Sequence, residues 1–431
     1  MKICALKLHS IAIADPPLRS SYGLHAPWAL RTIVELETDS GIKGVSETYG
    51  GDAPRAALEA MRERILGRDP FQLAGLYRQV SEAVSRKSEV PGGGSQTWLV
   101  PGENPLDQHN RTFAALEIAC LDIIGKAVGR PVCDVIGGRV RDSVAFSAYL
   151  FYKHGGGGGD GQYADEYGEV LSAEAAVREC RQMVKKYGFR EIKLKGGVLE
   201  PAEEIATIKA LRAEFGKDYP LRIDPNCAWS IETSVKVGEA LREELSGGGY
   251  LEDPCAELEG MSEVRKRIQM RLASNVAVTQ MADVLRARDL DAVQIVLSDP
   301  HYWGGMRQVQ HLSHLCEVLG MGLSMHSNSH LGVSMMAMTH VAAACPNLTF
   351  ACDTHYPWQT AKDEIVEGGR IGFENGAVTI PDKPGLGVTL DYDQLARGRE
   401  RYEKIPLRKR DDEAEMRKHV DPNWKRVLPR W

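Results

Sequence analysis

The sequence has no surplus of positive charge and no run of apolar residues long enough to cross a membrane. Its 53 lysines and arginines face 59 aspartates and glutamates, which gives a formal net charge of −6 at pH 7. Nucleic-acid-binding proteins usually carry a strong basic excess, so this balance argues against a nucleic-acid partner. No stretch approaches the ~18 consecutive apolar residues of a membrane span. We therefore expect a soluble protein with no membrane partner.

The sequence also lacks paired cysteines. Its nine cysteines are scattered and form no C-x-x-C motif. Several lie in apolar segments, where a reduced and buried thiol is the usual state. This usage favours a reducing, cytoplasmic compartment. The first residues, MKICALKLHSIAIAD, alternate in polarity and include Lys7 and His9, which indicates a strand and not a signal peptide.

Residues 1–140 have the pattern of a compact α+β unit. Alternating polarity predicts strands, and apolar residues at helical spacing then predict helices. The expected strands are 2–14, 30–38 and 43–49, and the expected helices are 53–64, 70–86 and 108–128. Between the last two helices, Pro91–Ser95 has the composition of a flexible loop.

From residue 144 onward, short β-favouring runs alternate with helical patterns. The eight runs are 144–150, 191–195, 221–225, 250–254, 271–275, 292–299, 322–327 and 348–353. Eight such units are typical of a (β/α)8 barrel. We therefore predict an α/β protein with an N-terminal α+β capping domain (1–140), a barrel (141–360) and a C-terminal segment (361–431) that returns to the capping domain. The glycine run Gly155–Gly159 is either a loop over the site or an inert insertion.

Polar side chains end these runs about one strand–helix repeat apart. They are Tyr149, Lys195, Asp224, Glu252, Asn275, Asp299, His326 and Asp353. Each one alone could be a helix cap or a solvated loop residue. Because the carboxyl ends of barrel strands converge on the face that carries catalytic residues, their recurrence in register predicts a shared site.

The residue types predict a metal centre between two bases. Asp224, Glu252 and Asn275 offer hard oxygen ligands from adjacent strands, which suits Mg²⁺, with Mn²⁺ as a second possibility. Lys193 and Lys195 are two apart and point to one face of their strand. We expect each lysine to lower the pKa of the other, bringing Lys195 towards neutrality.

A histidine base is predicted on the other side of the metal. Asp299 and His326 come from neighbouring strands, and such a carboxylate orients an imidazole and stabilises its charge. A lysine, an imidazole and a metal together suit removal of a proton next to a carboxylate, because base and electrostatic stabilisation must act at once on a carbon acid.

These residues resemble the enolase superfamily, mandelate racemase subgroup, and within it the glucarate dehydratase family. The resemblance covers essentially the whole chain. The similar segments are LHAPWALRT (24–32), AYLFY (148–152), KLKGG (193–197), DPNCAWS (224–230), SDPHYW (298–303), HSNSHLGVS (326–334), CDTHYPWQ (352–359), IPDKPGLGVTLD (380–391) and KRDD (409–412).

The resemblance implies a role for each matching residue. Asp224, Glu252 and Asn275 would bind Mg²⁺. Lys195, assisted by Lys193, would be one base, and His326, polarised by Asp299, the other. Residues implied to contact the acid sugar are His25, Tyr149, Asn226, His355 and Arg410, with the Arg410 fork on a distal carboxylate. The chain departs from the family pattern at Ser20 and near Gln108 and His109, which leaves the identity of the sugar acid open.

We therefore predict a Mg²⁺-dependent acid-sugar dehydratase, with D-glucarate as substrate and 5-dehydro-4-deoxy-D-glucarate as product. The alternative is a racemase or epimerase, or a dehydratase of another acid sugar, that uses the same lysine and histidine. A non-catalytic sugar-acid sensor is disfavoured by the complete set of ligands and bases. A sugar-phosphate enzyme is disfavoured because no glycine-rich phosphate cradle follows the last two strands. We expect a small-molecule acid sugar as partner and a homo-oligomeric assembly.

Overall fold

A three-stranded antiparallel sheet opens the chain. A computed structural model describes residues 1–84, 107–158 and 161–431, and only the backbone of Asp107. The strands are β1 (Ile3–Ala14), β4 (Trp28–Thr38) and β5 (Lys43–Tyr49), in the order β1-β4-β5. All three predicted strands are confirmed. The short strands β2 (Arg19–Ser20) and β3 (Gly23–Leu24) form a separate hairpin between β1 and β4.

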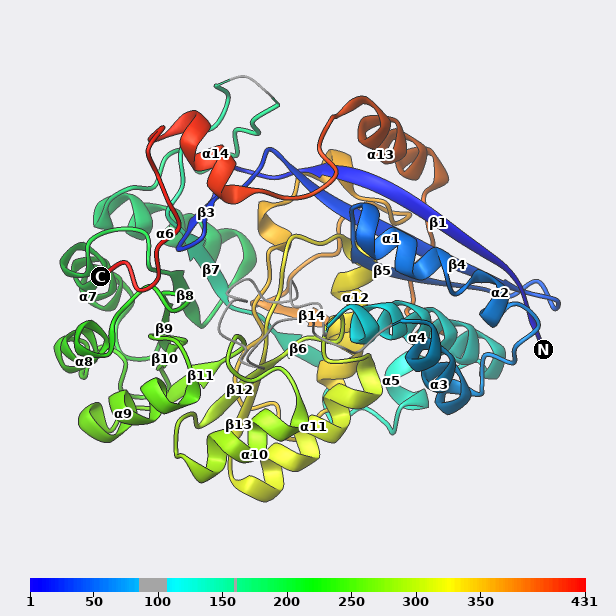
Figure 1. The fold of residues 1–431 in the computed structure, drawn as a ribbon, viewed down its shortest axis with the longest axis horizontal. Coiled ribbons are helices and arrows are strands. Elements are labelled where there is room, and N and C mark those ends of the chain that lie inside the picture. The colour runs from blue at the N-terminus through cyan, green and yellow to red at the C-terminus, as the bar shows by residue number, and fades with distance from the viewer. Residues whose placement is uncertain (85–106, 159–160) are drawn as a thin grey trace.

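Helices pack beside this sheet (Figure 1). They are α1 (Asp52–Glu59), α2 (Arg62–Ile65), α3 (Leu73–Ala83), α4 (Asp107–Val128) and α5 (Val132–Val135). The single helix predicted at 53–64 is two helices, because Met61 N donates to Leu58 O only three residues back and tightens the turn. The predicted loop Pro91–Ser95 lies outside the described residues.

Seven parallel strands form the second sheet, in unbroken chain order. They are β7 (Ala148–Phe151), β8 (Ile192–Lys195), β9 (Leu221–Asp224), β10 (Tyr250–Glu252), β11 (Leu272–Ser274), β12 (Ile295–Ser298) and β13 (Gly322–Met325). Nearly all of their residues are buried, as expected for a parallel sheet covered by helices. The sheet curves, and helices line its outer face (Figure 1). The predicted barrel architecture is confirmed for these seven strands.

The helices of the barrel follow the strands one by one. They are α6 (Ala173–Tyr187), α7 (Pro201–Phe215), α8 (Ile231–Ala240), α9 (Leu258–Ile268), α10 (Met281–Asp289), α11 (Met306–Leu319) and α12 (Gly332–Ala343). Local sequence sets their ends. The Ser172 side chain accepts a hydrogen bond from Ala175 N at the start of α6, and Gly188 ends that helix at φ 75°.

The eighth predicted run, 348–353, is not a strand of the sheet. It closes the ring through isolated parallel bridges, from Leu348 to Leu323 of β13 and from Cys352 to Phe146 before β7. Thr349 N and Phe350 N both donate to Leu323 O, at 3.1 and 3.2 Å. Two residues thus oppose one, which interrupts the ladder as a bulge does.

The run predicted at 144–150 also divides. Its first part is β6 (Ser143–Ala145), which pairs antiparallel with β14 (Ala377–Thr379) outside the barrel, and only its second part joins β7. Cys352 N donates to Ala145 O at 2.9 Å, so β6 still leads directly into the closing contact.

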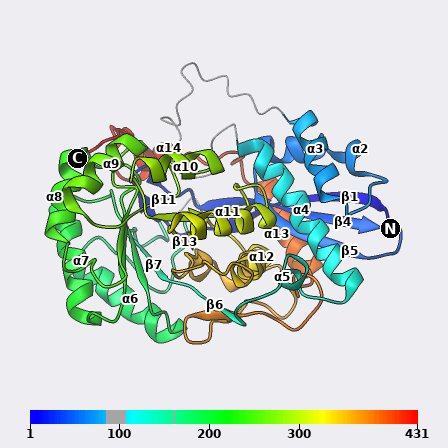
Figure 2. The same ribbon diagram turned by 90° about the horizontal axis from the view of Figure 1, so that it is seen from below.

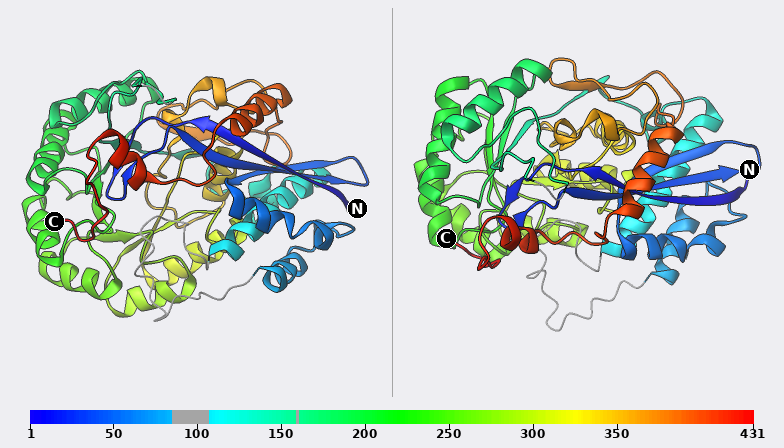
Figure 3. Two further views of the ribbon diagram at one scale, coloured as in Figure 1. Left: turned by 45° about the horizontal axis from the view of Figure 1, so that its top comes forward. Right: turned by 90° about the horizontal axis from the view of Figure 1, so that it is seen from above.

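The C-terminal segment runs back over the N-terminal sheet. It follows the 3-10 helix η2 (Tyr356–Trp358), and its own elements are the 3-10 helix η3 (Ala361–Asp363), then β14, α13 (Tyr392–Lys404) and α14 (Asp412–His419). Helix α13 packs on β1, where Arg401 Nε donates to Ala12 O at 3.0 Å, and α14 packs on β3 (Figure 3). Arg430 N and Trp431 N both donate to Ala228 O, beyond β9, at 2.7 and 3.0 Å. The domain boundaries at 140 and 360 stay a prediction.

One continuous apolar core joins the two parts of the molecule. Helix α12 is buried along its whole length, as expected for a helix that is apolar all round, and it lies between the N-terminal elements and the barrel (Figure 2). All nine cysteines are free, and eight of them are buried. Within the described residues, no helix combines the length and apolar character needed to span a bilayer.

The contact between β5 and α4 depends on a glycine. A Cβ at Gly44 would lie 2.0 Å from Ala119 O and 2.6 Å from Ile123 Cγ1. We expect Gly44→Ala to lower the free energy of unfolding by about 1–3 kcal/mol through overpacking. Urea denaturation followed by circular dichroism measures the change.

The matched control is Gly75→Ala in α3, where the nearest heavy atom to a Cβ would be Gln72 Cβ at 4.0 Å. This variant should gain roughly 0.5–1 kcal/mol, because alanine favours a helix over glycine. Unchanged stability of the Gly44 variant would contradict the close approach.

Candidate active site

Neighbouring strands bring predicted site residues together at the carboxyl end of the barrel. Lys195 of β8 is in register with Asp224 of β9, and its Nζ donates to Asp224 Oδ2 at 2.6 Å. Lys193 Nζ lies 2.7 Å from the Glu252 carboxylate of β10. All four side chains are buried. Two ammonium groups and two carboxylates therefore neutralise one another inside the barrel.

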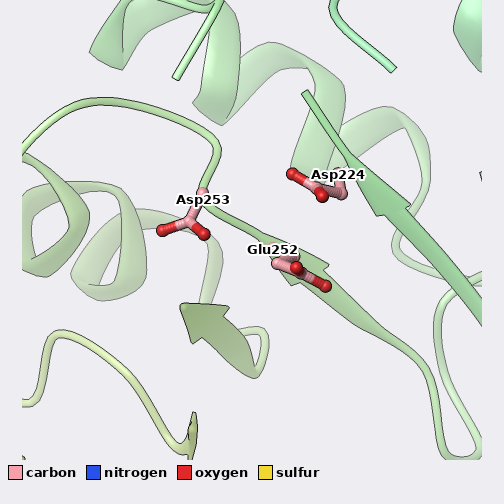
Figure 4. A group of neighbouring side chains, drawn as sticks. All are labelled: Asp224, Glu252 and Asp253. Atoms are coloured by element: carbon pink, nitrogen blue, oxygen red, sulfur yellow. The ribbon is translucent and has the colours of Figure 1, made fainter. Parts of the chain in front are cut away.

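A third carboxylate belongs to this cluster. Asp224, Glu252 and Asp253 each offer an oxygen, and the three oxygens lie within 4.8 Å of one another (Figure 4). Asp253 accepts hydrogen bonds from Ser274 Oγ at 2.6 Å and Asn275 N at 3.0 Å. Burial raises the pKa of Asp253 to about 6, with the Asp224 charge adding to the effect. The sequence analysis missed Asp253 because it lies one residue beyond the strand end.

Asp253 bonds to the backbone of Asn275, and the side chain of Asn275 makes no hydrogen bond to it. The amide oxygen and nitrogen of Asn275 are buried and have no hydrogen-bond partner among the described residues. Buried polar atoms are normally satisfied, so this amide points to a group that binds beside it. Asp224, Glu252 and Asn275 offer the hard oxygen donors that Mg²⁺ prefers. The residues present therefore fit a divalent cation.

The expectation of a lowered pKa for Lys195 is wrong in this structure. Burial would lower the pKa, but the Asp224 carboxylate outweighs burial and raises it above its ordinary value. The pKa of Lys193 is also raised, because the Asp353 and Glu252 carboxylates outweigh burial. The prediction considered only the repulsion between the two lysines, and the surrounding carboxylates dominate it.

The proposed histidine base is fixed by Asp299. His326 Nδ1 lies 3.0 Å from Asp299 Oδ2. Burial opposes ionisation of Asp299, but His301 and His326 outweigh it and lower the pKa of that carboxyl. An ionised carboxylate makes Nδ1 the donor, which leaves Nε2 of His326 to accept a proton.

His301 is a site residue that the sequence analysis did not single out. Its Nδ1 lies 2.7 Å from Asp299 Oδ1, and its Nε2 lies 2.6 Å from Ser334 Oγ. It follows Asp299 by two residues in the SDPHYW segment. This short distance from a predicted site residue was the signal in the sequence that could have identified it. Asp299 is thus held from both sides, by one imidazole on each oxygen.

Asp353 and Tyr149 surround Lys193. Asp353 Oδ2 accepts from Lys193 Nζ at 2.6 Å, and its other oxygen lies 3.5 Å from Arg222. The Tyr149 ring centroid lies 4.8 Å from Lys193 Nζ and 5.0 Å from the ring of His355. Both residues therefore help to hold Lys193 in place.

Two of the residues implied to bind the acid sugar meet at the barrel mouth. The rings of His25 and His355 are stacked at 6.5 Å, and Ser327 Oγ lies 2.8 Å from His355 Nδ1. Burial, with the neighbouring His25, lowers the pKa of His355. His25 Nδ1 lies 3.0 Å from Asp15 Oδ2, and its buried Nε2 has no hydrogen-bond partner in the described part of the chain.

Asn226 lies on the loop that follows Asp224. Its backbone is in the left-handed region at φ 44°, and its N donates to Asp224 Oδ1 at 3.0 Å. Its buried side-chain amide makes no hydrogen bond to any described residue. This amide is therefore available to a ligand.

Arg410 does not present a free fork. Its Nε donates to Asp412 Oδ1 at 2.6 Å, and its Nη2 pairs with Asp412 Oδ2 at 2.5 Å. Its guanidinium carbon also lies 5.6 Å from the ring centroid of Tyr22. Asp412 thus occupies two of the guanidinium nitrogens, and the role of Arg410 on a distal carboxylate stays a prediction.

Ser20, Gln108 and His109, where the chain departs from the family pattern, lie in three different surroundings. Gln108 lines a cavity of about 440 Å³ together with Arg410. His109 instead packs on α3, with its ring 5.0 Å from that of Tyr77. Ser20 lines a different cavity of about 270 Å³ that also contacts Gly197. Of the two residues named in α4, only Gln108 can therefore contact a ligand in the larger cavity.

Two family models match the chain. The model described as enolase C-terminal domain-like matches residues 175–395, and the mandelate racemase / muconate lactonizing enzyme N-terminal domain model matches residues 26–137. The chain belongs to the enolase superfamily, mandelate racemase subgroup. The resemblance noted in the sequence is confirmed.

Several relatives are similar to this protein over most or all of its length. A probable glucarate dehydratase of Streptomyces coelicolor is 43% identical over 100% of this chain and 99% of its own length. A D-xylonate dehydratase of Haloferax volcanii is 26% identical over 86% of this chain and 84% of its own. The crystal structure of an enolase of Pseudomonas fluorescens, with bound magnesium, potassium and tartrate, has a TM-score of 0.94 at 43% identity and covers 100% of this chain and 99% of its own.

Asp253 accepts hydrogen bonds from Ser274 and Asn275, so we expect it to position a metal ligand and not to bind the metal itself. We expect Asp253→Asn to weaken Mg²⁺ binding about 10- to 100-fold, as loss of a residue that orients a ligand does. Asp224→Asn should weaken it further, because a ligand charge is lost. Calorimetric titration with Mg²⁺ measures both variants against the unaltered protein. Equal losses in the two variants would make Asp253 a ligand, and no loss would remove it from the site.

Proposed function

We propose that the protein is a Mg²⁺-dependent dehydratase of an acid sugar, with D-glucarate as substrate and 5-dehydro-4-deoxy-D-glucarate as product. The observation that carries this proposal is the buried cluster of Asp224, Glu252 and Asp253, in which Lys195 is bonded to Asp224. The unbonded side chain of Asn275 and the His326–Asp299 pair support it. The 43% identity to a probable glucarate dehydratase and the relation to a D-xylonate dehydratase support it.

Asp224, Glu252 and Asn275 would hold the ion. When bound, Mg²⁺ supplies positive charge that stabilises the negative charge developing on a substrate carboxylate. The relative from Pseudomonas fluorescens was crystallised with magnesium, which supports this choice of ion.

His326 is the base that we assign to the α-proton. Asp299 fixes Nδ1 as a donor, so Nε2 takes the proton from carbon 5 as that C–H bond breaks. The electron pair forms a double bond to carbon 4, whose C–O bond breaks, and a proton from His326 converts the leaving hydroxyl to water. The resulting enol then takes up a proton at carbon 4 and becomes the keto acid. One histidine thus first accepts and then returns a proton.

Lys195 and Lys193 act from the other side of the barrel. Their strand, β8, is separated from β13, which precedes His326, by four strands of the sheet. The ammonium groups balance carboxylate charge, and Lys195 faces the substrate carbon opposite His326. Lys195 is bonded to Asp224 as an ammonium in this structure. It would have to lose that proton before it could remove one from a substrate of opposite configuration.

An epimerase is the second candidate, because two bases on opposite sides can exchange a proton without elimination. Incubation in heavy water separates the two candidates. A dehydratase gives a keto acid, whereas an epimerase incorporates deuterium at the α-carbon and retains the hydroxyl. The homo-oligomeric assembly and cytoplasmic location stay predictions from the sequence.

The substrate prediction is tested with D-glucarate, L-idarate, galactarate and D-gluconate in the presence of Mg²⁺. We expect a keto acid from D-glucarate, detected by semicarbazone absorbance, and loss of activity with excess EDTA that added Mg²⁺ restores. If no sugar acid of a broad panel yields a keto acid, the protein is not a dehydratase of this class.

The role of the histidine is tested by substitution. His326→Asn should lower kcat by about 10²- to 10⁴-fold, the usual contribution of a general base, with an unchanged circular dichroism spectrum. The matched control is His311→Asn, an exposed histidine of α11 bonded only to Gln308. Wild-type turnover in the His326 variant would remove it from the mechanism.

A further inference from the structure

A cavity of about 440 Å³ beside the proposed site carries a strongly basic lining. Five of its lining residues are arginine or lysine, and Asp52 is the one described acid. Its walls come from β4, β5, the start of α4 and the segment 408–410. Asn328 and Ser329, two and three residues after His326, complete it. The cavity therefore lies directly against the loop that carries the proposed base.

Arg111 of α4 is the unpaired guanidinium of this cavity. Its Nε and Nη2 are buried, and no described residue accepts a hydrogen bond from either. By contrast, Arg31 Nε donates to Glu47 at 2.8 Å, and Arg410 is bonded to Asp412. Leaving buried guanidinium donors without an acceptor is costly, so Nε and Nη2 of Arg111 are suited to bind an anion.

The Tyr49 ring holds the guanidinium in place. The Arg111 guanidinium carbon lies 4.3 Å from the centroid of that ring. Stacking of this kind restrains the planar group by its face and leaves its N–H edge free for a carboxylate, which accepts two parallel bonds from such a fork. A single phenol ring thus prepares Arg111 for a planar anion.

The same ring connects Arg111 to the catalytic side of the barrel. The Tyr49 and His301 ring centroids lie 6.3 Å apart, and His301 holds Asp299, which in turn holds His326. Arg111 therefore lies on the His326 side of the site. The rings of Tyr49 and His301 and the carboxylate of Asp299 connect it to His326. Asn328 and Ser329, on the loop that carries His326, line the same cavity as Arg111, so the cavity adjoins the proposed base.

We propose that Arg111 binds the carboxylate at the far end of the acid sugar, so that the cavity selects sugar acids with a carboxylate at both ends. This inference rests on the proposed function, and it adds Arg111 to Arg410, the residue expected to hold that carboxylate, in the lining of the same cavity. Arg111 is a specificity residue that contacts substrate and takes no part in the proton transfers.

The test compares two six-carbon acids, D-glucarate with two carboxylates and D-gluconate with one. Arg111→Gln should lower kcat/KM for D-glucarate on the order of 10- to 100-fold, mainly through KM, as loss of a hydrogen bond to a charged group does. The value for D-gluconate should change less than about threefold, since that acid offers no second charge to lose. Arg111→Lys should restore part of the preference, because it keeps the charge and loses the fork.

The matched control is Arg288→Gln in α10, which removes the same group from an exposed side chain outside the cavity. Its ratio of D-glucarate to D-gluconate should stay within about threefold of the unaltered protein, as expected for a solvent-screened charge. Calorimetric binding of both acids in the presence of Mg²⁺ supplies a second readout that needs no turnover. If Arg111→Gln does not fold, the Arg111→Lys variant decides by the same ratio.

The possible results distinguish a failure of the Arg111 assignment from a failure of the proposed function. Turnover of D-glucarate with an unchanged diacid preference in the Arg111 variants overturns the role of Arg111 and leaves the function standing. Tight binding of D-glucarate that depends on Arg111, without turnover, supports the cavity and overturns the dehydratase. Neither binding nor turnover of any diacid overturns both.

Discussion

The charges buried at the carboxyl end of β8 to β10 constrain the rest of the molecule. Several ionised groups lie in an interior where an unpaired charge is far more costly than in water. Lys193 is bonded to both Glu252 and Asp353. Asp353 belongs to the segment 348–353 that closes the barrel. The pairing of Lys193 with Asp353 therefore adds to the backbone hydrogen bonds by which this segment closes the barrel.

The N-terminal elements take part in the site by holding barrel helices. Glu47 of β5 accepts hydrogen bonds from Leu331 N and Ser334 N, at 2.9 and 3.0 Å, at the start of α12. Glu117 of α4 accepts from Met306 N at 2.6 Å at the start of α11. An acid at a helix N-terminus satisfies free N–H groups and the helix dipole. These two helices follow the strands that lead to the proposed base and its carboxylate, so the N-terminal part fixes the geometry of the catalytic side.

Periodic features were predictable from the sequence, and local exceptions were not. Strand ends such as Asp224 and Glu252 recur at the repeat length, so their convergence follows from the barrel itself. Asp253 lies one residue beyond the end of β10, and His301 lies three residues beyond the end of β12. At such positions spacing alone does not distinguish a positioning residue from a loop residue. The eighth strand was expected, but a bulge at 349–350 breaks its ladder. The free Arg111 guanidinium depends on which arginines find a carboxylate, and only the packed structure decides that.

The alternative between elimination and epimerisation turns on how firmly the substrate is oriented. The two proposed bases, Lys195 and His326, would permit either reaction if each reached one face of the same carbon. A substrate held by one carboxylate alone can turn and present either face. If Arg111 also binds the far carboxylate, the molecule is fixed at both ends, and its reacting carbon presents one face to His326. The proton removed from that face then has one productive route, return to the leaving hydroxyl. Anchoring at two ends thus favours elimination over exchange between the bases, with no change in the bases themselves.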